Sequence, residues 1–392
     1  MRILLVHNFY QQPGGEDEVF AAEGKLLESA GHEVHRFTMD NDAIDSMSKL
    51  QLARRTIWNA EPAERIARLV REHRIEIAHF HNTFPLISPA AYSAARSAGA
   101  AVVQTLHNFR LLCPAATFFR AGRVCEDCVH SRLLTPAVRH KCYRDNRGAT
   151  AVLGGMLLAH RALGTWRSQI DRYIALSQFA RDKFIASGFN AQQIAIKPNF
   201  LVDDPGIGAG AGGFALFVGR LTEEKGVRTM LAAWSNVRHP KRRLIIVGDG
   251  PLRNEVCDAV SRNQTIEYLG RQPMPRVLEL MGDARALVFP SQWYEGQPRT
   301  IVESFARGTP VLASDLGTMR EMIIPNETGW RVPSGDVESL GKSLENLFDE
   351  RISLDPMRVA ARARFERDHS ADRNLMMLLD IYHEARRRRA AA

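Results

Sequence analysis

The sequence predicts an α/β protein of two domains, each with a doubly wound parallel sheet. Short apolar runs alternate with amphipathic stretches of helical period, which is the pattern of repeated strand–helix–strand units. The alternation stops at the Gly-rich segment 202–213, which cannot hold a regular element, and then starts again. At about 150 residues per domain, a chain of 392 residues accommodates both. We therefore predict domains at 1–200 and 201–392, joined by an interdomain linker.

The first domain opens with a buried strand at residues 2–6, because every side chain after Arg2 in this run is aliphatic. A helix is expected at 16–29, where Val19, Phe20, Leu26 and Leu27 form an apolar face. The remaining strands are expected at apolar runs that each follow a helical stretch: 33–37, 75–79, 101–106 and 173–176.

The second domain repeats this pattern, with strands expected at 214–218, 243–247, 266–269, 286–289 and 311–313. Residues 337–389 then have a helical period, with Leu340 and Leu344 on one apolar face and Leu378 and Tyr382 on another. By analogy, we expect the last helix to pack back across the domain junction. Two such domains would face each other across a cleft, which is a favoured place for a ligand.

Composition and charge exclude several classes of protein. With 45% hydrophobic and 24% charged residues, the chain has the balance of a globular protein rather than a disordered one. The net charge is +8, but no nucleic-acid recognition motif accompanies it, so no nucleic acid partner is expected. No apolar run reaches about 18 residues, so we expect no membrane span and a cytoplasmic location. The cluster from Arg386 to Arg389 is a solvated helix end, or it attracts anionic lipid at the inner face of the cytoplasmic membrane.

Two carboxylates follow the predicted strand 286–289. Glu295 and Glu303 lie eight residues apart, and doubly wound sheets bind ligands beyond the carboxyl ends of their strands. If Pro298 starts a helix, Glu303 lies in its second turn and Glu295 in the preceding loop, so both can point into one cleft beside free backbone amides. The alternative is that one glutamate caps the helix and the other covers its surface.

Two more predicted strands of the second domain end in glycine. Gly219 and Arg220 end the strand 214–218, and Lys225 follows five residues after Arg220. Two cations so placed can neutralise a diphosphate without a metal, or they pair with the neighbouring acidic residues at 223 and 224. Gly248 ends the strand 243–247 in a tight turn whose exposed backbone lets a ligand approach closely.

Polar residues also mark strand ends in the first domain. Gly15 leads into the helix 16–29, whose free amides can contact phosphate, although acidic residues in the first turn satisfy the same dipole. His107 follows the strand 101–106, where a titratable side chain suits chemistry. His79 and His81 have the spacing of a metal-binding pair on a strand, but no matching ligands are evident, so we interpret them as structural.

Four of the five cysteines gather in an insertion at residues 113–142. Cys113, Cys125, Cys128 and Cys142 contain one close pair flanked by two more thiols, which suits a tetrahedral structural zinc. A zinc ribbon more usually has two close pairs, so reduced thiols and disulfides remain alternatives. A zinc here would stiffen a loop without touching the chemistry.

In this order, the motifs resemble those of glycosyltransferase family 4, the group 1 glycosyltransferases of GT-B fold, over nearly the whole chain. The residues that carry the resemblance are Gly14, Gly15, His107, Gly219, Arg220, Lys225, Gly248, Glu295, Glu303, 308–311, Glu321 and Gly329. The resemblance implies two Rossmann-like domains and the transfer of a sugar from a nucleotide diphosphate sugar, with retention and no catalytic metal. The acceptor would be a saccharide or a lipid-linked acceptor in polysaccharide or glycolipid biosynthesis, and peripheral contact with an anionic membrane would suit the latter. The alternatives are a synthase of a soluble glycoside and a non-catalytic sugar-nucleotide binding module.

The resemblance also implies roles for individual residues. Arg220 and Lys225 would bind the donor diphosphate, and Glu303 would hold the ribose hydroxyls. His107 would line the reaction centre, and Glu295 would lie near the transferred sugar. The remaining donor-binding positions would act through their backbone: Gly15, Gly219, Gly248, Gly296, Gln297, Pro298 and Arg299.

Overall fold

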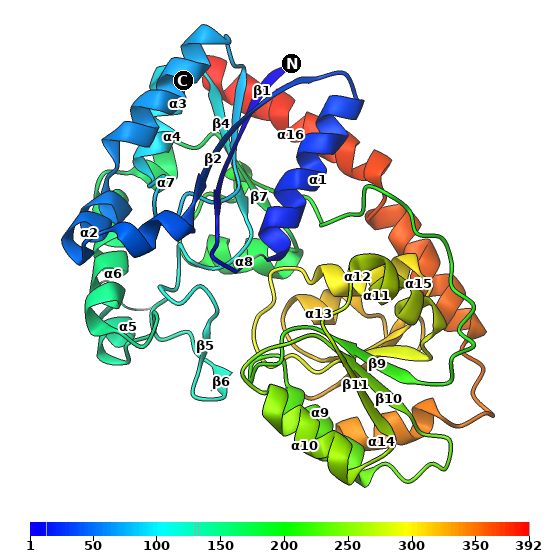
Figure 1. Ribbon diagram of the computed structural model, residues 1–392. Helices are drawn as coiled ribbons and strands as arrows, with labels where there is room; N and C mark the ends of the chain where they lie inside the picture. Colours follow the sequence, from blue (N-terminus) through cyan, green and yellow to red (C-terminus); the bar gives the residue numbers. More distant parts are fainter. Residues whose placement is uncertain (13, 130, 132, 392) are drawn as a thin grey trace. The chain divides into compact units, whose positions relative to one another are not determined.

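The computed structural model describes all residues except 13, 130, 132 and 392, and it divides the chain into two units (Figure 1). Unit 1 comprises Met1–Phe118, Cys125–Pro198 and Ala371–Ala392, and unit 2 comprises Phe119–Val124 and Asn199–Ser370. Each unit contains a six-stranded sheet whose neighbouring strands are all parallel. The prediction of two α/β domains with doubly wound parallel sheets is therefore confirmed.

The sheet of unit 1 has the strand order β2-β1-β3-β4-β7-β8. The chain winds from β1 to β2 on one side and from β3 onward on the other, so the direction of winding reverses between β1 and β3. Six consecutive residues of β1 are buried, as expected for a strand covered on both faces. The strand bounds are β1 Arg2–Phe9, β2 Glu33–Asp40, β3 Ile77–Phe80, β4 Ala101–Leu106, β7 Arg172–Ala175 and β8 Ile194–Ile196.

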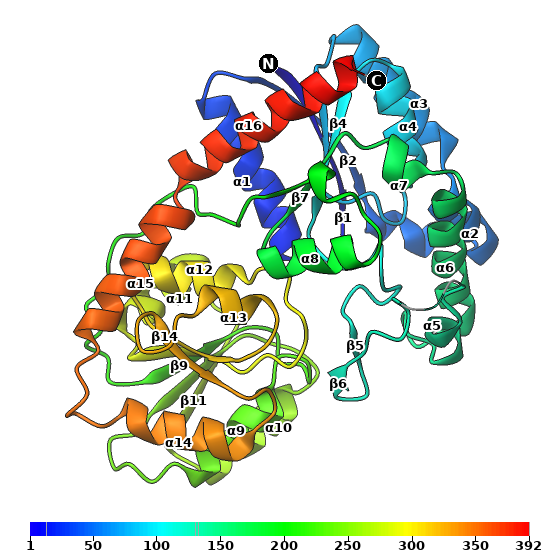
Figure 2. The same cartoon turned by 180° about the vertical axis from the view of Figure 1, so that it is seen from behind.

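Helices cover both faces of this sheet (Figure 2). In both views α1 and α16 lie on one side of the sheet, and α3 and α4 lie on the other (Figures 1 and 2). The bounds are α1 Gly15–Ser29, α2 Lys49–Ile57, α3 Ala60–Glu72, α4 Ala90–Ser97, α5 Thr135–Arg139, α6 Arg147–Ala162, α7 Thr165–Ser168, α8 Gln178–Ala186 and α16 Ala371–Ala390, with short 3₁₀ turns at Asn41–Ser46 and Ala191–Gln193.

The last helix, α16, belongs to unit 1, although the sequence division at residue 200 places it in the second domain. Leu378, Ile381 and Tyr382 are buried in one cluster with Ile3 and Leu5 of β1. Burial of its apolar face therefore attaches α16 to the sheet of unit 1. The two preceding helices, α14 (Val337–Leu347) and α15 (Asp355–Asp368), stay in unit 2. Apart from the short segment Phe119–Val124, the chain passes from unit 1 to unit 2 after Pro198.

The sheet of unit 2 has the order β11-β10-β9-β12-β13-β14, and the direction of winding reverses between β9 and β12. One face packs against α9 and α14 through a cluster that includes Met230, Trp234 and Leu344. The other face packs against α12 and α15 through Val302, Phe305 and other apolar residues. The bounds are β9 Ala215–Val218, α9 Val227–Asn236, β10 Leu244–Val247, α10 Arg253–Arg262, β11 Ile266–Gly270, α11 Met274–Asp283, β12 Ala286–Phe289, α12 Arg299–Ala306, β13 Val311–Ser314, α13 Thr318–Met322, β14 Gly329–Val332, α14 Val337–Leu347 and α15 Asp355–Asp368.

The Gly-rich segment 202–213 is not a free linker, because its backbone is bonded along unit 2. The amide of Gly208 donates to the carbonyl of Arg307 at 3.0 Å, and the amide of Gly210 donates to that of Gly282 at 2.8 Å. A Cβ at Gly208 would lie 2.1 Å from the Cα of Gly282, so the glycine allows close backbone approach. The glycines that suggested flexibility in the sequence serve close packing here.

The cysteine-containing insertion carries a short antiparallel hairpin, formed by β5 Phe119–Arg120 and β6 Arg123–Val124. Its turn contains Ala121 and Gly122, both at positive φ. Within the part of the chain that the structure describes, no helix combines the length and apolar character that a bilayer crossing requires.

Candidate functional site

The first group of candidate residues lies in unit 2 at the carboxyl ends of β9 and β12. Strand order reverses at this point, and open α/β sheets bind ligands in the crevice beside such a reversal. Gly219 and the exposed Arg220 follow β9, whereas Glu295 and Gly296 follow β12. Residues about 75 positions apart in the sequence therefore follow neighbouring strands at one edge of the sheet.

Lys225 and Glu295 form an ion pair at this edge. Lys225 Nζ lies 2.7 Å from Glu295 Oε1, and the side chains are only 16% and 8% exposed. Ser291 Oγ donates to the same carboxylate oxygen at 2.7 Å. Lys225 Nζ also lies 5.3 Å from the centre of the Trp293 ring, within range of a cation–π interaction. The partner of Lys225 is thus Glu295 rather than an acidic neighbour in its own loop.

The loop between β12 and α12 is fixed by hydrogen bonds from outside it. The hydroxyl of Thr318 lies 3.0 Å from the carbonyl oxygen of Glu295 and 2.9 Å from that of Gly296. The amide group of Asn199 donates to the carbonyl of Gln297 at 2.8 Å, and the backbone N–H of Asn199 donates to the Gln297 side chain. The segment predicted to contact the transferred sugar is therefore held rigidly.

Glu303 lies in the second turn of α12, as the sequence predicts. The helix begins at Arg299 with Pro298 as its N-cap residue. Glu303 is 4% exposed, and its Oε1 lies 3.7 Å from a guanidinium nitrogen of Arg299, one turn earlier. A buried carboxylate so near a helix N-terminus is a strong acceptor for hydroxyl groups.

Gly219 and Gly248 bring two strand ends into backbone contact. Gly248 has φ of 137°, and a Cβ at this position would lie 1.8 Å from the carbonyl oxygen of Gly219. The amide of Gly219 donates to the carbonyl of Val247 at 3.0 Å, which holds the two ends together. Neither glycine has a side chain, so a bound group can approach the backbone closely at these strand ends.

The second group of candidate residues lies in unit 1, at the carboxyl ends of β3 and β4. His107 follows β4 and is partly exposed. Its Nε2 lies 3.0 Å from Nδ1 of His81, which follows β3. Burial, and then the neighbouring His81, holds the pKa of His107 well below its ordinary value, so this imidazole is neutral at physiological pH.

Gly15 is exposed at the start of α1, beside the His107 strand end. Asn108 Nδ2 donates to Glu16 Oε1 at 2.6 Å, which links the two segments. The carboxylate of Asp17 accepts the backbone N–H of Gly14 at 2.7 Å. The Asp17 carboxylate thus already accepts the hydrogen bond from the Gly14 amide at the site expected to contact phosphate. The role of Gly15 in binding phosphate therefore stays a prediction.

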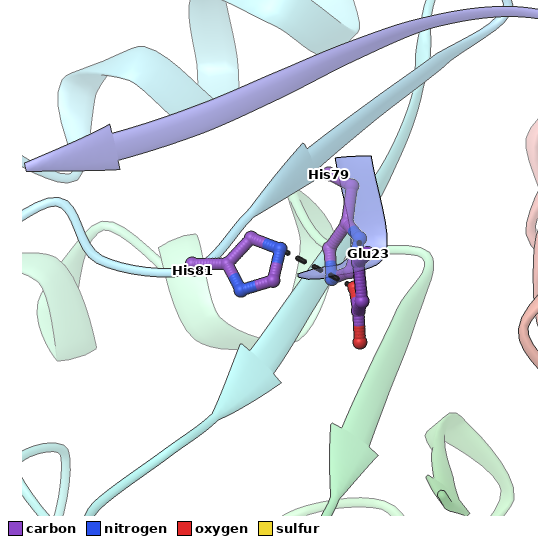
Figure 3. A group of neighbouring side chains, drawn as sticks. All are labelled: Glu23, His79 and His81. Atoms are coloured by element: carbon purple, nitrogen blue, oxygen red, sulfur yellow. Dashed lines mark ion pairs between the residues drawn. The ribbon is translucent and has the colours of Figure 1, made fainter. Parts of the chain in front are cut away.

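Two buried charges, Glu23 and Lys197, lie beside His79 and His81 and were not predicted from the sequence; Figure 3 shows Glu23 with the two histidines. Glu23 of α1 and Lys197, which follows β8, are both fully buried, with Nζ 2.6 Å from Oε1. Glu23 Oε2 lies 3.5 Å from His79 Nδ1 and 3.4 Å from His81 Nε2. The signal available in the sequence was a glutamate on the apolar face of the predicted helix.

Glu23, His79 and His81 form one of two groups of described residues whose potential metal-ligand atoms all lie within 4.8 Å of one another. The geometry favours an ion-pair network over a metal site, because Lys197 already supplies a cation to Glu23. Both ring nitrogens of His79 are also hydrogen-bonded at 2.8 Å, to the hydroxyls of Tyr382 and Thr105. The second group, Glu33, His35 and His73, is largely exposed.

The four clustered cysteines are neither joined by disulfides in the described part of the chain nor members of a close metal-ligand group. Burial, together with the neighbouring thiols of Cys113, Cys142 and Cys125, raises the pKa of the Cys128 thiol to about 12. Backbone amides of residues 115 to 118 point at the Cys113 sulfur and oppose the effect of burial on its pKa. The four thiols thus share one neighbourhood, and zinc there stays a prediction.

Comparisons with known proteins agree with this arrangement. The family described as Glycosyltransferase Family 4 matches residues 13–204, and the family described as Glycosyl transferases group 1 matches residues 210–364. The chain is 29% identical over 177 residues to a glycogen synthase of Mycobacterium tuberculosis, covering 44% of this chain and 42% of the relative. It is 30% identical over 199 residues to a phosphatidyl-myo-inositol mannosyltransferase of Mycobacterium leprae, covering 47% of this chain and 52% of the relative.

Solved structures extend the likeness to the whole chain. Anabaena HepE in complex with UDP has a TM-score of 0.67 and 17% identity, covering 97% of this chain and 99% of that one. The two doubly wound units therefore have the GT-B fold of glycosyltransferases. The chain belongs to glycosyltransferase family 4, the group 1 glycosyltransferases. It spans about half the length of the curated relatives that it matches.

Proposed function

We propose that the protein transfers a hexosyl group from a nucleoside diphosphate sugar to a saccharide or lipid-linked acceptor in polysaccharide or glycolipid biosynthesis. The observation that carries the proposal is the Lys225–Glu295 ion pair at the carboxyl ends of β9 and β12, with Arg220 beside it. Two cations at the ligand-binding edge of a doubly wound sheet suit a diphosphate. The solved complex of Anabaena HepE with UDP supports this class of donor.

We infer that the transfer retains the anomeric configuration and requires no catalytic metal. The bond from C1 of the sugar to the diphosphate oxygen breaks, and a bond from C1 to the acceptor oxygen forms on the same face. The proton of the acceptor hydroxyl passes to the leaving diphosphate, so charge grows there during the reaction. Arg220 and Lys225 are placed to stabilise that charge, and fixed charges need no reorganisation during the reaction.

The donor site is tested by the thermal stability of the full chain with UDP-, GDP-, ADP- and dTDP-sugars. A donor that binds only the folded state raises the melting temperature. One donor should stabilise the wild type, and Glu303→Ala should abolish this effect because it removes the proposed ribose contact. The matched control is Glu338→Ala, since the side chain of Glu338 is 79% exposed and pairs with a lysine one turn away in α14. No shift with any donor would contradict the donor site.

Catalysis is tested with the donor so identified. Release of nucleoside diphosphate in the presence of an acceptor, with the product anomer assigned by proton NMR, distinguishes a transferase from a silent binding module. An inverted product would contradict the inferred stereochemistry. Loss of activity in chelator, restored by added metal, would contradict metal independence.

The nature of the acceptor separates the two candidate pathways. Contact between the arginine cluster 386–389 and an anionic bilayer would favour a lipid-linked acceptor. Sedimentation with vesicles that contain anionic lipid, compared with neutral vesicles, measures this contact. A protein that stays in the supernatant and uses soluble sugars equally well would instead be a synthase of a soluble glycoside.

We also propose a structural zinc at Cys113, Cys125, Cys128 and Cys142. The mutual electrostatic effect of these thiols, and the amides that face the Cys113 sulfur, support it. Metal analysis of the purified chain, with and without Cys125→Ser and Cys128→Ser, tests it. A zinc-free wild type of normal stability would contradict the proposal, because structural zinc contributes directly to folding.

A further inference from the structure

Three side chains form a continuous path of polar contacts from the interior of unit 1 to His107, through an ion-pair contact between Glu23 and His81 and a hydrogen bond between His81 and His107. Glu23 comes from α1, His81 follows β3, and His107 follows β4. Glu23 and His81 are buried, whereas His107 is partly exposed. Figure 3 shows the ring of His81 beside the Glu23 carboxylate. The path starts at a fixed charge and ends at the residue expected to line the reaction centre.

The first step of the path is the ionised carboxylate of Glu23. Burial alone would raise its pKa, but Lys197 and the two histidines hold the pKa well below its ordinary value. Lys197 Nζ donates to Glu23 Oε1 at 2.6 Å and to Asn374 Oδ1 at 3.0 Å. An ionised carboxylate only accepts hydrogen bonds. Its second oxygen, Oε2, therefore requires a donor.

The second step fixes the hydrogen of His81. Its Nε2 lies at an ion-pair distance of 3.4 Å from Glu23 Oε2, and neither atom is hydrogen-bonded to a described residue. His79 Nδ1 lies 3.5 Å from the same oxygen but is hydrogen-bonded to the Tyr382 hydroxyl instead. The hydrogen therefore lies on Nε2, where it faces the carboxylate. Burial lowers the pKa of His81 despite Glu23, and the nearby His7 and Lys197 act in the same direction. A neutral ring with its hydrogen on Nε2 has a lone pair on Nδ1.

The third step shows how the tautomer of His81 determines the tautomer of His107. The Nδ1 atom of His81 accepts, so Nε2 of His107, at 3.0 Å, must donate. A neutral His107 with hydrogen on Nε2 has its lone pair on Nδ1. We propose that Glu23 and His81 are positioning residues that hold His107 in this tautomer, so that its Nδ1 accepts a hydrogen bond from a hydroxyl of the sugar substrate. The sugar part of this inference rests on the proposed function.

The tautomer can be measured directly. In the full chain labelled with ¹⁵N-histidine, long-range ¹H–¹⁵N correlation at neutral pH shows which ring nitrogen carries hydrogen, and His107→Gln identifies the signals of His107. The expected result is hydrogen on Nε2 of His107 in the wild type. Hydrogen on Nδ1, or a charged ring, would overturn the proposal. The wild-type chain carries this measurement, and His107→Gln serves to assign the signals.

Variants of His81 then separate positioning from structure. His81→Phe keeps an aromatic ring but removes the acceptor, so His107 should populate both tautomers and kcat should fall about tenfold, as for the loss of one hydrogen bond. His81→Asn restores a carbonyl oxygen near the position of Nδ1 and should recover most of the rate. His79→Phe is the matched control, because His79 is also buried, lies two residues earlier, in β3, and bonds to Tyr382 and Thr105 instead of His107.

The outcomes are distinguishable. If His81→Phe and His79→Phe lower kcat equally, or if His81→Phe leaves the His107 signals unchanged, the positioning role of His81 is refuted. If the wild type transfers sugar from no nucleotide sugar, the proposed function and the sugar contact fail together, whereas the ¹⁵N spectrum still decides the tautomer. If His81→Phe does not fold, Glu23→Gln takes its place, and a wild-type tautomer in that variant would refute the role of Glu23.

Discussion

Replacing Lys225 by methionine should weaken binding of the donor nucleotide by removing one cation from the diphosphate site. Lys225 is only 16% exposed, so its charge is less screened than that of a surface lysine. A hydrogen bond to a charged group contributes about 1.5–3 kcal/mol, which corresponds to about a 10- to 100-fold rise in Kd. The loss should appear in titration calorimetry with UDP, or with whichever nucleotide stabilises the wild type most.

The variant leaves Glu295 with the Ser291 hydroxyl as a partner, at 2.7 Å. Some loss of stability is therefore expected, and the titration is made well below the melting temperature of the variant. Lys342→Met is the matched control, because Lys342 pairs with Glu338 on the exposed surface of α14 in the same unit. A Kd for Lys225→Met within about threefold of the wild-type value, or an equal loss in the control, would refute the assignment of Lys225 to the diphosphate.

Three other perturbations test the structure. Gly248→Ala should abolish nucleotide binding and lower the melting temperature, because its Cβ would lie 1.8 Å from a backbone oxygen; Gly270→Ala, at φ of 66° with open space around it, should cost only backbone strain, and equal effects would contradict the account. Burial lowers the pKa of His369 to about 4, below the unfolded value of about 6.5, so its stabilising effect is present above that value and is lost as pH falls towards 4. Between about pH 7.5 and 5.5 the free energy of unfolding should fall by about 1.4 kcal/mol more in the wild type than in His369→Gln. Parallel curves of unfolding free energy against pH for the two proteins would refute this prediction. Leu344→Ala, in the core of unit 2 with 0% exposure, should destabilise that unit by about 2–5 kcal/mol in denaturant unfolding, and a loss below about 1 kcal/mol would show that this core repacks.

The central strands could be predicted from the sequence because each is a continuous apolar run. The expected ranges 101–106 and 286–289 coincide with β4 and β12, which are buried throughout. The edge strands β8 and β14 were missed, because the apolar run of β8 has only three residues and β14 mixes apolar residues with glycine and arginine. An edge strand has a neighbouring strand on one side only, so fewer of its residues are buried and its apolar pattern in the sequence is weaker.

The candidate site was predictable where local pattern sufficed. Residues at strand ends, such as Gly219 and His107, follow from the position of the strand alone. The pairing of Lys225 with Glu295 spans 70 residues, and that of Glu23 with Lys197 spans 174. Such pairs depend on which strands become neighbours, and neither spacing nor periodicity contains that information.

The return of α16 to unit 1 has a consequence for synthesis on the ribosome. Leu378, Ile381 and Tyr382 complete the core that contains Ile3 and Leu5, so residues of β1 wait for a helix made much later before their burial is complete. At about 5–20 residues per second, the nascent chain exposes that apolar face for many seconds. All residues of unit 2 have been made once Ser370 is added, before α16 is made. Unit 2 can therefore complete its core before unit 1 does, although most of it is made later.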